Sequence, residues 1–247
     1  MIPIFKKELA QFFSSLTGFI FIGLFLLLSS LLLLVIPSTV VLDYNIINNN
    51  YATLTKFFKL APWLLIVLTP AITMRLLADE YKQGTFEILT TLPLTTRQIL
   101  LGKYLSAIGL VTIALLPTIL YVIAVKALST SNGIDAGSTI GAYIGLYALA
   151  AIFVAIGLYC SSLTSNAVAA FLYAVLGCLL FYYLCTAISN IPFFSSGADY
   201  YIQLLGLDYH YTSISRGVIK LSSIIYFGSA VALFLALTYR SISQHKK

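Results

Sequence analysis

The stretch FIFIGLFLLLSSLLLLVI, residues 19–36, runs for eighteen positions without a charged side chain. In a helix, which rises 1.5 Å per residue, a run of this length nearly spans the hydrocarbon core of a bilayer. The residues that follow, Pro37 and Ser38, are not the small-residue cleavage site of a secretory signal. The stretch therefore predicts an uncleaved first transmembrane helix.

Working outward, five more stretches have the same character, and none carries Asp, Glu, Lys or Arg near its middle. The whole chain is 60% hydrophobic and 9% charged, against roughly 25% charged residues in soluble domains. Backbone polar groups in lipid must be satisfied internally, which long apolar runs achieve as helices. We predict an all-α membrane protein of one domain, residues 1–247, with the further spans at 60–77, 99–125, 140–163, 167–188 and 219–239.

The positions of the basic residues predict the topology. Six spans place both termini on one side, and nine Lys or Arg lie on that side against five opposite. Because cytoplasmic loops carry the excess of basic residues, both termini are expected in the cytoplasm. The net charge of +6 is thus attributed to topology and not to nucleic-acid binding. The nine are Lys6, Lys7, Arg75, Lys82, Arg97, Lys103, Arg240, Lys246 and Lys247; the five are Lys56, Lys59, Lys126, Arg216 and Lys220.

The segment before the first span is amphipathic. Residues 2–15 place Phe5, Leu9, Phe12 and Phe13 on one helical face. This pattern is typical of an interfacial helix lying on the inner leaflet. The alternative is a simple extension of the first span beyond the bilayer.

Small residues mark where the spans approach closely. Gly141 and Gly145 form a ridge on the fourth span, and Ala170, Ala174 and Gly177 form one on the fifth. Small residues at four-residue spacing let helix backbones come close. We expect these two helices to pack within one chain; a dimer seam is the alternative.

Signs of catalytic chemistry are lacking in the sequence. There is no HExxH, GxSxG or GxxxxGK[ST] motif, and Gly102-Lys103 is followed by Tyr104. His210 is expected to be a solvated loop histidine. Cys160, Cys178 and Cys185 lie in apolar segments and are expected to be structural thiols. We therefore expect no catalytic residue, metal or cofactor in this chain, which is not predicted to be an enzyme.

The joint between the second and third spans is the most informative segment. It reads MRLLADEYKQGTFEILTTLPLTTRQILLGKYL over residues 74–105. Gly84 is a natural helix terminator, and Thr85 can cap a short helix over residues 85–92 that Pro93 ends. Thr95 and Gln98 then form a capping box that starts the third span.

The short helix 85–92 is expected to need a partner. Phe86, Ile88, Leu89 and Leu92 leave apolar surface on a helix too short to be stable alone. Glu87 lies in its first turn, where a negative charge is favoured. Such a segment, held between two spans, would pass an applied force to both of them.

Residues along this joint resemble the pattern of ABC-2 type permeases. The resemblance is carried by Glu80, Gly84-Thr85-x-Glu87-x-Leu89, Pro93 and Gly102-Lys103. Further stretches look like the gliding-motility-associated ABC transporter permease subunit, GldF, over nearly the whole chain. These are Phe5-Lys6-Lys7-Glu8-Leu9, Phe12-Phe13, residues 54–74 with Ala61-Pro62-Trp63, and Ser213-Ile214-Ser215-Arg216-Gly217-Val218-Ile219.

The resemblance implies a type V exporter-like permease whose helix 85–92 is a coupling helix. It implies a separate cytosolic, GldA-like ATPase that binds ATP and Mg, a membrane partner of the GldG type, and a second permease copy in the bacterial inner membrane. Phe86, Ile88 and Leu89 would dock on the ATPase, with Glu80 and Glu87 pairing to its basic residues. Uncharged span interiors favour a lipid-like or protein substrate over a small ion. The alternative function is a scaffold or force-transmitting anchor that recruits an ATPase and transports nothing.

Overall fold

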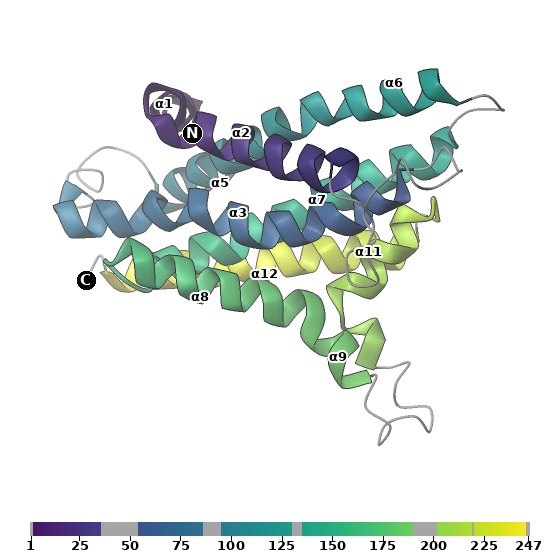
Figure 1. Ribbon diagram of the computed structural model, residues 1–247. Helices are drawn as coiled ribbons and strands as arrows, with labels where there is room; N and C mark the ends of the chain where they lie inside the picture. Colours follow the sequence, from purple (N-terminus) through teal and green to yellow (C-terminus); the bar gives the residue numbers. More distant parts are fainter. Residues whose placement is uncertain are drawn as a thin grey trace.

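The computed structural model describes residues 2–35, 54–85, 95–129, 135–189, 202–218 and 220–245, and every regular element in these ranges is helical. Figure 1 shows both termini at one end of an elongated bundle. The elements are α1 (Ile2–Ser14), α2 (Leu16–Ser30) with a π-helical turn (Leu31–Val35), α3 (Thr55–Gln83), α5 (Thr96–Leu115), a 3-10 turn (Leu116–Thr118), α6 (Ile119–Leu128), α7 (Ala136–Ser162), α8 (Ala167–Leu179), a second π-helical turn (Leu180–Leu184), α9 (Cys185–Ser189), α11 (Leu207–Ser215) and α12 (Leu221–His245).

Within the described ranges, six helices are long and apolar enough to cross a membrane, which confirms the predicted fold class. The second, Thr55–Gln83, extends beyond the predicted 60–77 because polar residues continue the helix past its apolar run. Pro117 bends the third span, where α5 passes through a 3-10 turn into α6. The six are Leu16–Val35, Thr55–Gln83, Thr96–Ala127, Ala136–Ser162, Ala167–Ser189 and Leu221–Gln244.

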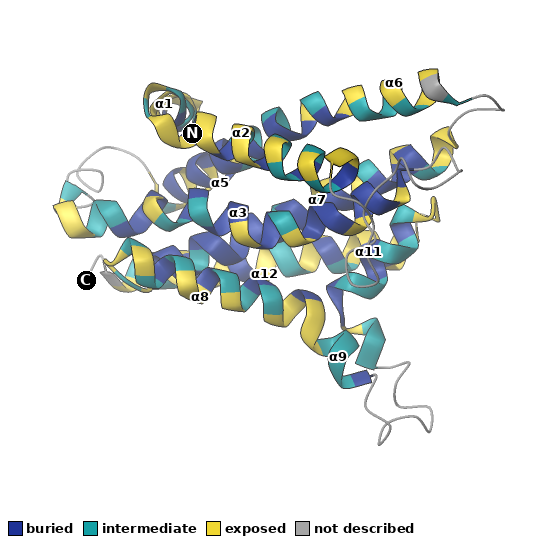
Figure 2. Ribbon diagram, in the orientation of Figure 1, coloured by how far each residue is buried: buried dark blue, intermediate teal, exposed yellow. Residues whose placement is uncertain are grey.

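Helices α3 and α7 form the centre of the bundle. Within the most apolar window of each, 67% of the residues are buried, against 22–28% for the other four spans. Figure 2 shows this contrast between the buried central helices and the more exposed outer ones. Gly157 of α7 lies so close to α3 that a Cβ there would fall 2.0 Å from Thr73 Oγ1. A glycine is therefore required at this crossing.

Helix α1 is separate from the first span. The helix is interrupted at Ser15, whose backbone is extended with φ −97° and ψ 155°. Phe5 and Leu9 of α1 pack on α5 at Gly109, where a Cβ would lie 3.5 Å from each side chain. The structure thus has a helix over Ile2–Ser14 that is separate from the first span, in place of an unbroken extension. Its position on the inner leaflet stays a prediction.

The first of the two small-residue ridges has a different neighbour from the one expected. Gly141 and Gly145 lie against α11, where a Cβ at either position would crowd Ile214. Gly177 of α8 does face α7, at Ile156, and Ala170 and Ala174 are fully buried. Of the two ridges, the second one meets the neighbouring span, at Gly177. The spacing in the sequence marks close approach but does not identify the partner.

Burial of His210 corrects the expectation of a solvated loop residue. The side chain is 3% exposed and its ring stacks on Tyr226 of α12, with centroids 4.3 Å apart. Its Nε2 lies 2.9 Å from the Leu204 carbonyl oxygen, so Nε2 donates, and Nδ1 accepts from the Ser223 hydroxyl at 3.0 Å. Burial lowers the pKa of His210 below 6.5; the charge of Lys220 acts in the same direction, against the Leu204 hydrogen bond.

The cysteines are free thiols. Cys160 and Cys178 are buried, as expected of structural thiols, and Cys185 is half-buried.

Candidate functional site

A buried charge cluster joins three helices near the end of the bundle that holds the termini. It consists of Glu8 of α1, Glu80 of α3 and Lys103 of α5. Lys103 is 1% exposed, although it carries a full charge. Lysine is almost never fully buried unless it is paired, so the cluster depends on its partners.

Three acceptors surround the Lys103 ammonium group. Nζ donates to Glu8 Oε1 at 3.0 Å, to Glu80 Oε1 at 2.7 Å and to the Leu76 carbonyl oxygen at 2.7 Å. An ammonium has three hydrogens, so its donor capacity is fully used. One side chain thereby fixes α1, α3 and α5 relative to one another.

The cluster holds more negative than positive charge. Two carboxylates share one ammonium, and Lys7 adds a longer contact to Glu8 Oε1 at 3.7 Å from an exposed position. Among the described residues, Glu80 Oε2 is buried and accepts no hydrogen bond. A buried acceptor without a donor costs free energy. Glu80 can therefore accept a hydrogen bond from one further donor, and such a bond would be stabilising.

A cavity of about 520 Å³ adjoins this cluster, between the α1–α2 break and α3. Charged residues of both signs line one part of it, and Ile20, Phe21 and Leu24 of the first span line another. The charged lining consists of Lys7, Glu8, Arg75, Asp79, Glu80 and Lys103.

The joint between the second and third spans is anchored at both ends. Helix α3 stops at Gly84, which has φ 66°, a left-handed conformation that glycine adopts without steric cost. The Thr85 hydroxyl lies 3.5 Å from the Glu80 carbonyl oxygen. On the far side, Thr95 and Gln98 form the predicted capping box, with reciprocal bonds of 3.3 and 3.1 Å.

Helix α3 is also held by α7 one turn before Glu80. The Ser161 hydroxyl donates to the Met74 carbonyl at 2.9 Å and accepts from the amides of Leu77 and Ala78 at 3.1 Å each. With the close Gly157 contact, this makes the end of α3 part of a rigid frame.

The structure places the residues proposed for ATPase coupling as follows. Glu80 lies in the charge cluster, where Lys103 of the same chain occupies Oε1. Gly84 and Thr85 end α3. Phe86, Glu87, Ile88, Leu89 and Pro93 lie outside the described residues.

Glu8 and Lys103 were not proposed as site residues. A signal for both was present. Lys103 falls inside the apolar stretch 99–125, and Glu8 places a charge four residues from both Ile4 and Phe12, in line with apolar positions of an amphipathic helix. A charge within a predicted span requires a partner. Identifying that partner required the positions of three helices in space.

No group of three or more His, Cys, Asp or Glu in the described part of the chain is arranged to hold a metal ion. The family profile of the ABC-2 family transporter proteins matches residues 2–241. The chain belongs to the ABC-2 transporter family. A search of the curated proteins finds no match to it.

This membership makes the chain a transmembrane permease subunit of an ABC transporter. Within the family, the permease is the membrane component, and ATP hydrolysis belongs to a partner ATP-binding subunit. The charge cluster and the anchored joint are therefore features of the membrane component of such a transporter.

Proposed function

We propose that this permease couples to a separate cytosolic ATPase through residues 85–92 and works in an ABC transporter of the gliding-motility type. The observation that carries the coupling proposal is the Glu8–Lys103–Glu80 cluster. It joins α3, near its last turn, to α5, about two turns after Thr95, and joins both helices to α1. The GldF-like residues support the assignment to gliding motility.

The geometry of the anchors supports a mechanical role. A displacement of residues 86–94 would reach α3 through Gly84 and α5 through Thr95, since both helices begin or end there. Lys103 ties these two helices to each other and to α1, so the three would move together. Helix α1 would thus transmit the motion to the first span across Ser15.

The assembly proposed around this chain adds three components to it. A GldA-like ATPase binds ATP and Mg, a GldG-type protein lies in the membrane, and a second permease copy completes the pathway. The complex resides in the inner membrane with both termini cytoplasmic, which the excess of Lys and Arg on the terminus side supports. The middles of the spans carry no charged residue, which favours a lipid-like or protein substrate.

Variants in the joint test the coupling. Phe86→Ala with Glu87→Lys is expected to abolish co-purification of the ATPase and its stimulation by the permease. Lys82→Gln is the matched control, because Lys82 is an exposed residue in the last turn of α3 that precedes the joint. Unchanged co-purification and stimulation in the double variant would contradict the proposal. An ATPase that binds but is never stimulated by the wild-type permease would favour a scaffold.

A further inference from the structure

The cavity of about 520 Å³ beside the charge cluster lies between two helices that run in opposite directions. Helix α2 begins at the end of the bundle that holds the termini, and α3 ends there, as Figure 1 shows. Helix α1 and Lys103 of α5 complete the lining. The volume falls in the range of ligand-binding pockets, about 300–1,000 Å³.

The walls of this cavity are fixed by contacts of the fold. Lys103 holds α1 against α3 through its bonds to Glu8 and Glu80. Helices α1 and α2 meet at a tight corner, where a Cβ at Gly18 would lie 2.6 Å from the Phe12 carbonyl oxygen. A glycine at this position lets the two backbones approach so closely. The cavity is therefore a built feature of the fold.

Both long walls change from polar to apolar in the same direction. On α2, Thr17 lies towards the termini and Leu24 lies deeper in the bundle. On α3, Asp79 lies towards the termini and Leu68 lies deeper. Ile20 and Leu24 are 51% and 40% exposed, so the apolar part opens sideways, towards the bilayer. A ligand that fills the cavity needs a polar end on the terminus side and an apolar end in the bilayer.

The charges of the lining balance. Of its six charged residues, three are basic and three are acidic. The charge cluster and its contact to Lys7 account for two of each sign. Arg75 and Asp79 remain, and neither forms an ion pair with any residue that the structure describes. A neutral lining with one cation and one anion to offer favours a ligand that carries both charges.

The order of these groups along α3 points to the kind of ligand. Arg75 lies about 10 Å along the helix from Leu68, and Asp79 lies about 6 Å further on. Towards the termini, the wall is thus first apolar, then positive, then negative. A phospholipid with an amine head group presents the complementary order, with acyl chains, then a phosphate, then an ammonium.

We propose that this cavity binds phosphatidylethanolamine. Its acyl chains lie along Leu24 and Leu68, its phosphate pairs with Arg75, and its ammonium donates a hydrogen bond to the Asp79 carboxylate. Phosphatidylcholine has no N–H to donate, and phosphatidylglycerol has no cation for Asp79. A soluble zwitterion would leave the apolar part of the cavity unfilled. The proposal does not depend on ATPase coupling.

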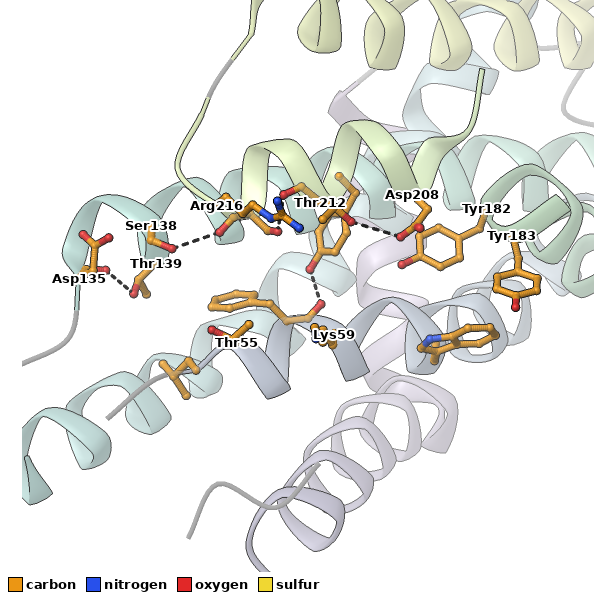
Figure 3. Close-up of a pocket in the computed structure, with 15 residues that line it drawn as sticks. Thr55, Lys59, Asp135, Ser138, Thr139, Tyr182, Tyr183, Asp208, Thr212 and Arg216 are labelled. Carbon is orange, nitrogen blue, oxygen red and sulfur yellow. Dashed lines mark hydrogen bonds between the residues drawn. The ribbon is translucent and has the colours of Figure 1, made fainter. Parts of the chain in front are cut away.

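A second cavity, of about 560 Å³, shows that balanced charge alone does not produce this order. Lys59 and Arg216 line it together with Asp135 and Asp208. In Figure 3, Asp208 lies beside Tyr182, and Arg216 lies farther along α11. From the aromatic end, an anion therefore comes before this cation, which is the reverse of the order along α3. The order of charges thus distinguishes the cavity between α2 and α3.

A tryptophan placed in the cavity reports which lipid occupies it. Trp63 is the only tryptophan of the chain, so Trp63→Phe with Leu24→Trp leaves one reporter, in the apolar part. The purified full-length chain is placed in nanodiscs of equal phosphatidylethanolamine and phosphatidylcholine, with bromine on the acyl chains of one lipid or of the other. We expect quenching to show a preference of about two- to tenfold for phosphatidylethanolamine, because it alone can donate to Asp79.

Two further reporters in the same Trp63→Phe background separate the cavity from the surrounding lipid. Ile20→Trp, which lies one turn nearer the head group, should show the same preference as Leu24→Trp. Leu27→Trp is the matched control, because Leu27 is 58% exposed on the same helix and lies outside the lining. It should show no preference.

Variants of α3 test the order of charges. Asp79→Asn is expected to bring the preference close to one, whereas Asp79→Glu should retain it. Arg75→Asp with Asp79→Arg keeps both charges but reverses their order, and it should also abolish the preference. Asp135→Asn is the matched control, because it removes a carboxylate outside the cavity, and asparagine can still cap α7. It should leave the preference unchanged.

Several results would overturn the proposal. Equal quenching of the two cavity reporters by the two lipids would do so, as would an equal preference at Leu27→Trp. A preference that survives Asp79→Asn or the reversed pair would show that the charges of α3 do not select the lipid. Stronger quenching by phosphatidylglycerol than by phosphatidylethanolamine would indicate an anionic lipid.

A last comparison separates the lipid from a soluble zwitterion. Free phosphoethanolamine is expected to leave the lipid preference unchanged. If it abolishes the preference, the cavity takes a soluble ligand and the lipid assignment is wrong. Because the ATPase is absent from these measurements, failure here leaves the coupling proposal untouched.

Discussion

Replacement of Lys103 by methionine tests the charge cluster most sharply. Methionine keeps much of the side-chain length but removes the ammonium that donates to Glu8, Glu80 and the Leu76 carbonyl. The two carboxylates then lose the buried cation that they share, and the longer contact from Lys7 to Glu8 remains. Removing one partner of a buried ion pair costs about 3–5 kcal/mol.

The loss is expected to appear as a lower unfolding temperature. For a chain of this size, each kcal/mol lowers the midpoint by about 2–4 °C, so Lys103→Met should lower it by about 6–20 °C. Thermal unfolding is followed by circular dichroism of the purified chain in detergent. Lys7→Met is the control, because Lys7 is exposed and its contact to Glu8 is longer, at 3.7 Å. It should cost about 0–1 kcal/mol.

Neutralising the stranded carboxylates should reverse most of the effect. The triple variant Lys103→Met, Glu8→Gln, Glu80→Gln replaces the charges with groups that bury more cheaply, and such replacements are often close to neutral. The reasoning is refuted if Lys103→Met is as stable as Lys7→Met. It is also refuted if the triple variant is no more stable than Lys103→Met alone, since the cost would then not be electrostatic.

Three further predictions concern other contacts. Tyr211→Phe should lower the free energy of unfolding by about 1–3 kcal/mol, because it leaves the Phe58 carbonyl, which Pro62 cannot satisfy, without a donor. Denaturant unfolding measures this, and Tyr173→Phe, at an exposed tyrosine of α8, is the comparison. Gly157→Ala should force α3 and α7 apart at Thr73 and lower the free energy of unfolding by about 1–3 kcal/mol. Gly23→Ala, where the added methyl group meets open space, should not lower it. Equal stabilities of the two variants would argue against the close crossing of α3 and α7. The pKa of His210 is lowered in the folded chain, so the unfolded chain binds the proton more readily. The stability that this histidine contributes above pH 6.5 should therefore be lost as the pH falls below 6.5. His210→Gln should flatten this dependence, and thermal unfolding midpoints measured across the pH range would show whether it does.

Elements whose signals are local could be predicted from the sequence. The six spans follow from apolar runs, the end of α3 from Gly84, and the start of α5 from the Thr95 and Gln98 pair. Each depends on residues within a few positions of one another. The same local signals are available for residues 85–92, where the coupling helix stays a prediction.

Contacts that depend on tertiary placement were beyond sequence reasoning. His210 belongs to a helix of nine residues, too short for a clear periodicity, and it is buried only because α11 folds against α12. Gly141 and Gly145 indicate a close neighbour, yet nothing in their spacing distinguishes α8 from α11. Glu8, Glu80 and Lys103 are separated by 72 and 23 positions, so their pairing becomes visible only once three helices have been placed.

The most direct test of the central claim is the movement of the joint with nucleotide. Spin labels are attached at Lys82, an exposed position in the last turn of α3, in the two permease copies of the purified complex with its ATPase. The account predicts that the distance between the labels changes when ATP and Mg bind, and that Lys103→Met weakens or abolishes the change. A distance that stays constant while the ATPase turns over would contradict coupling through this joint.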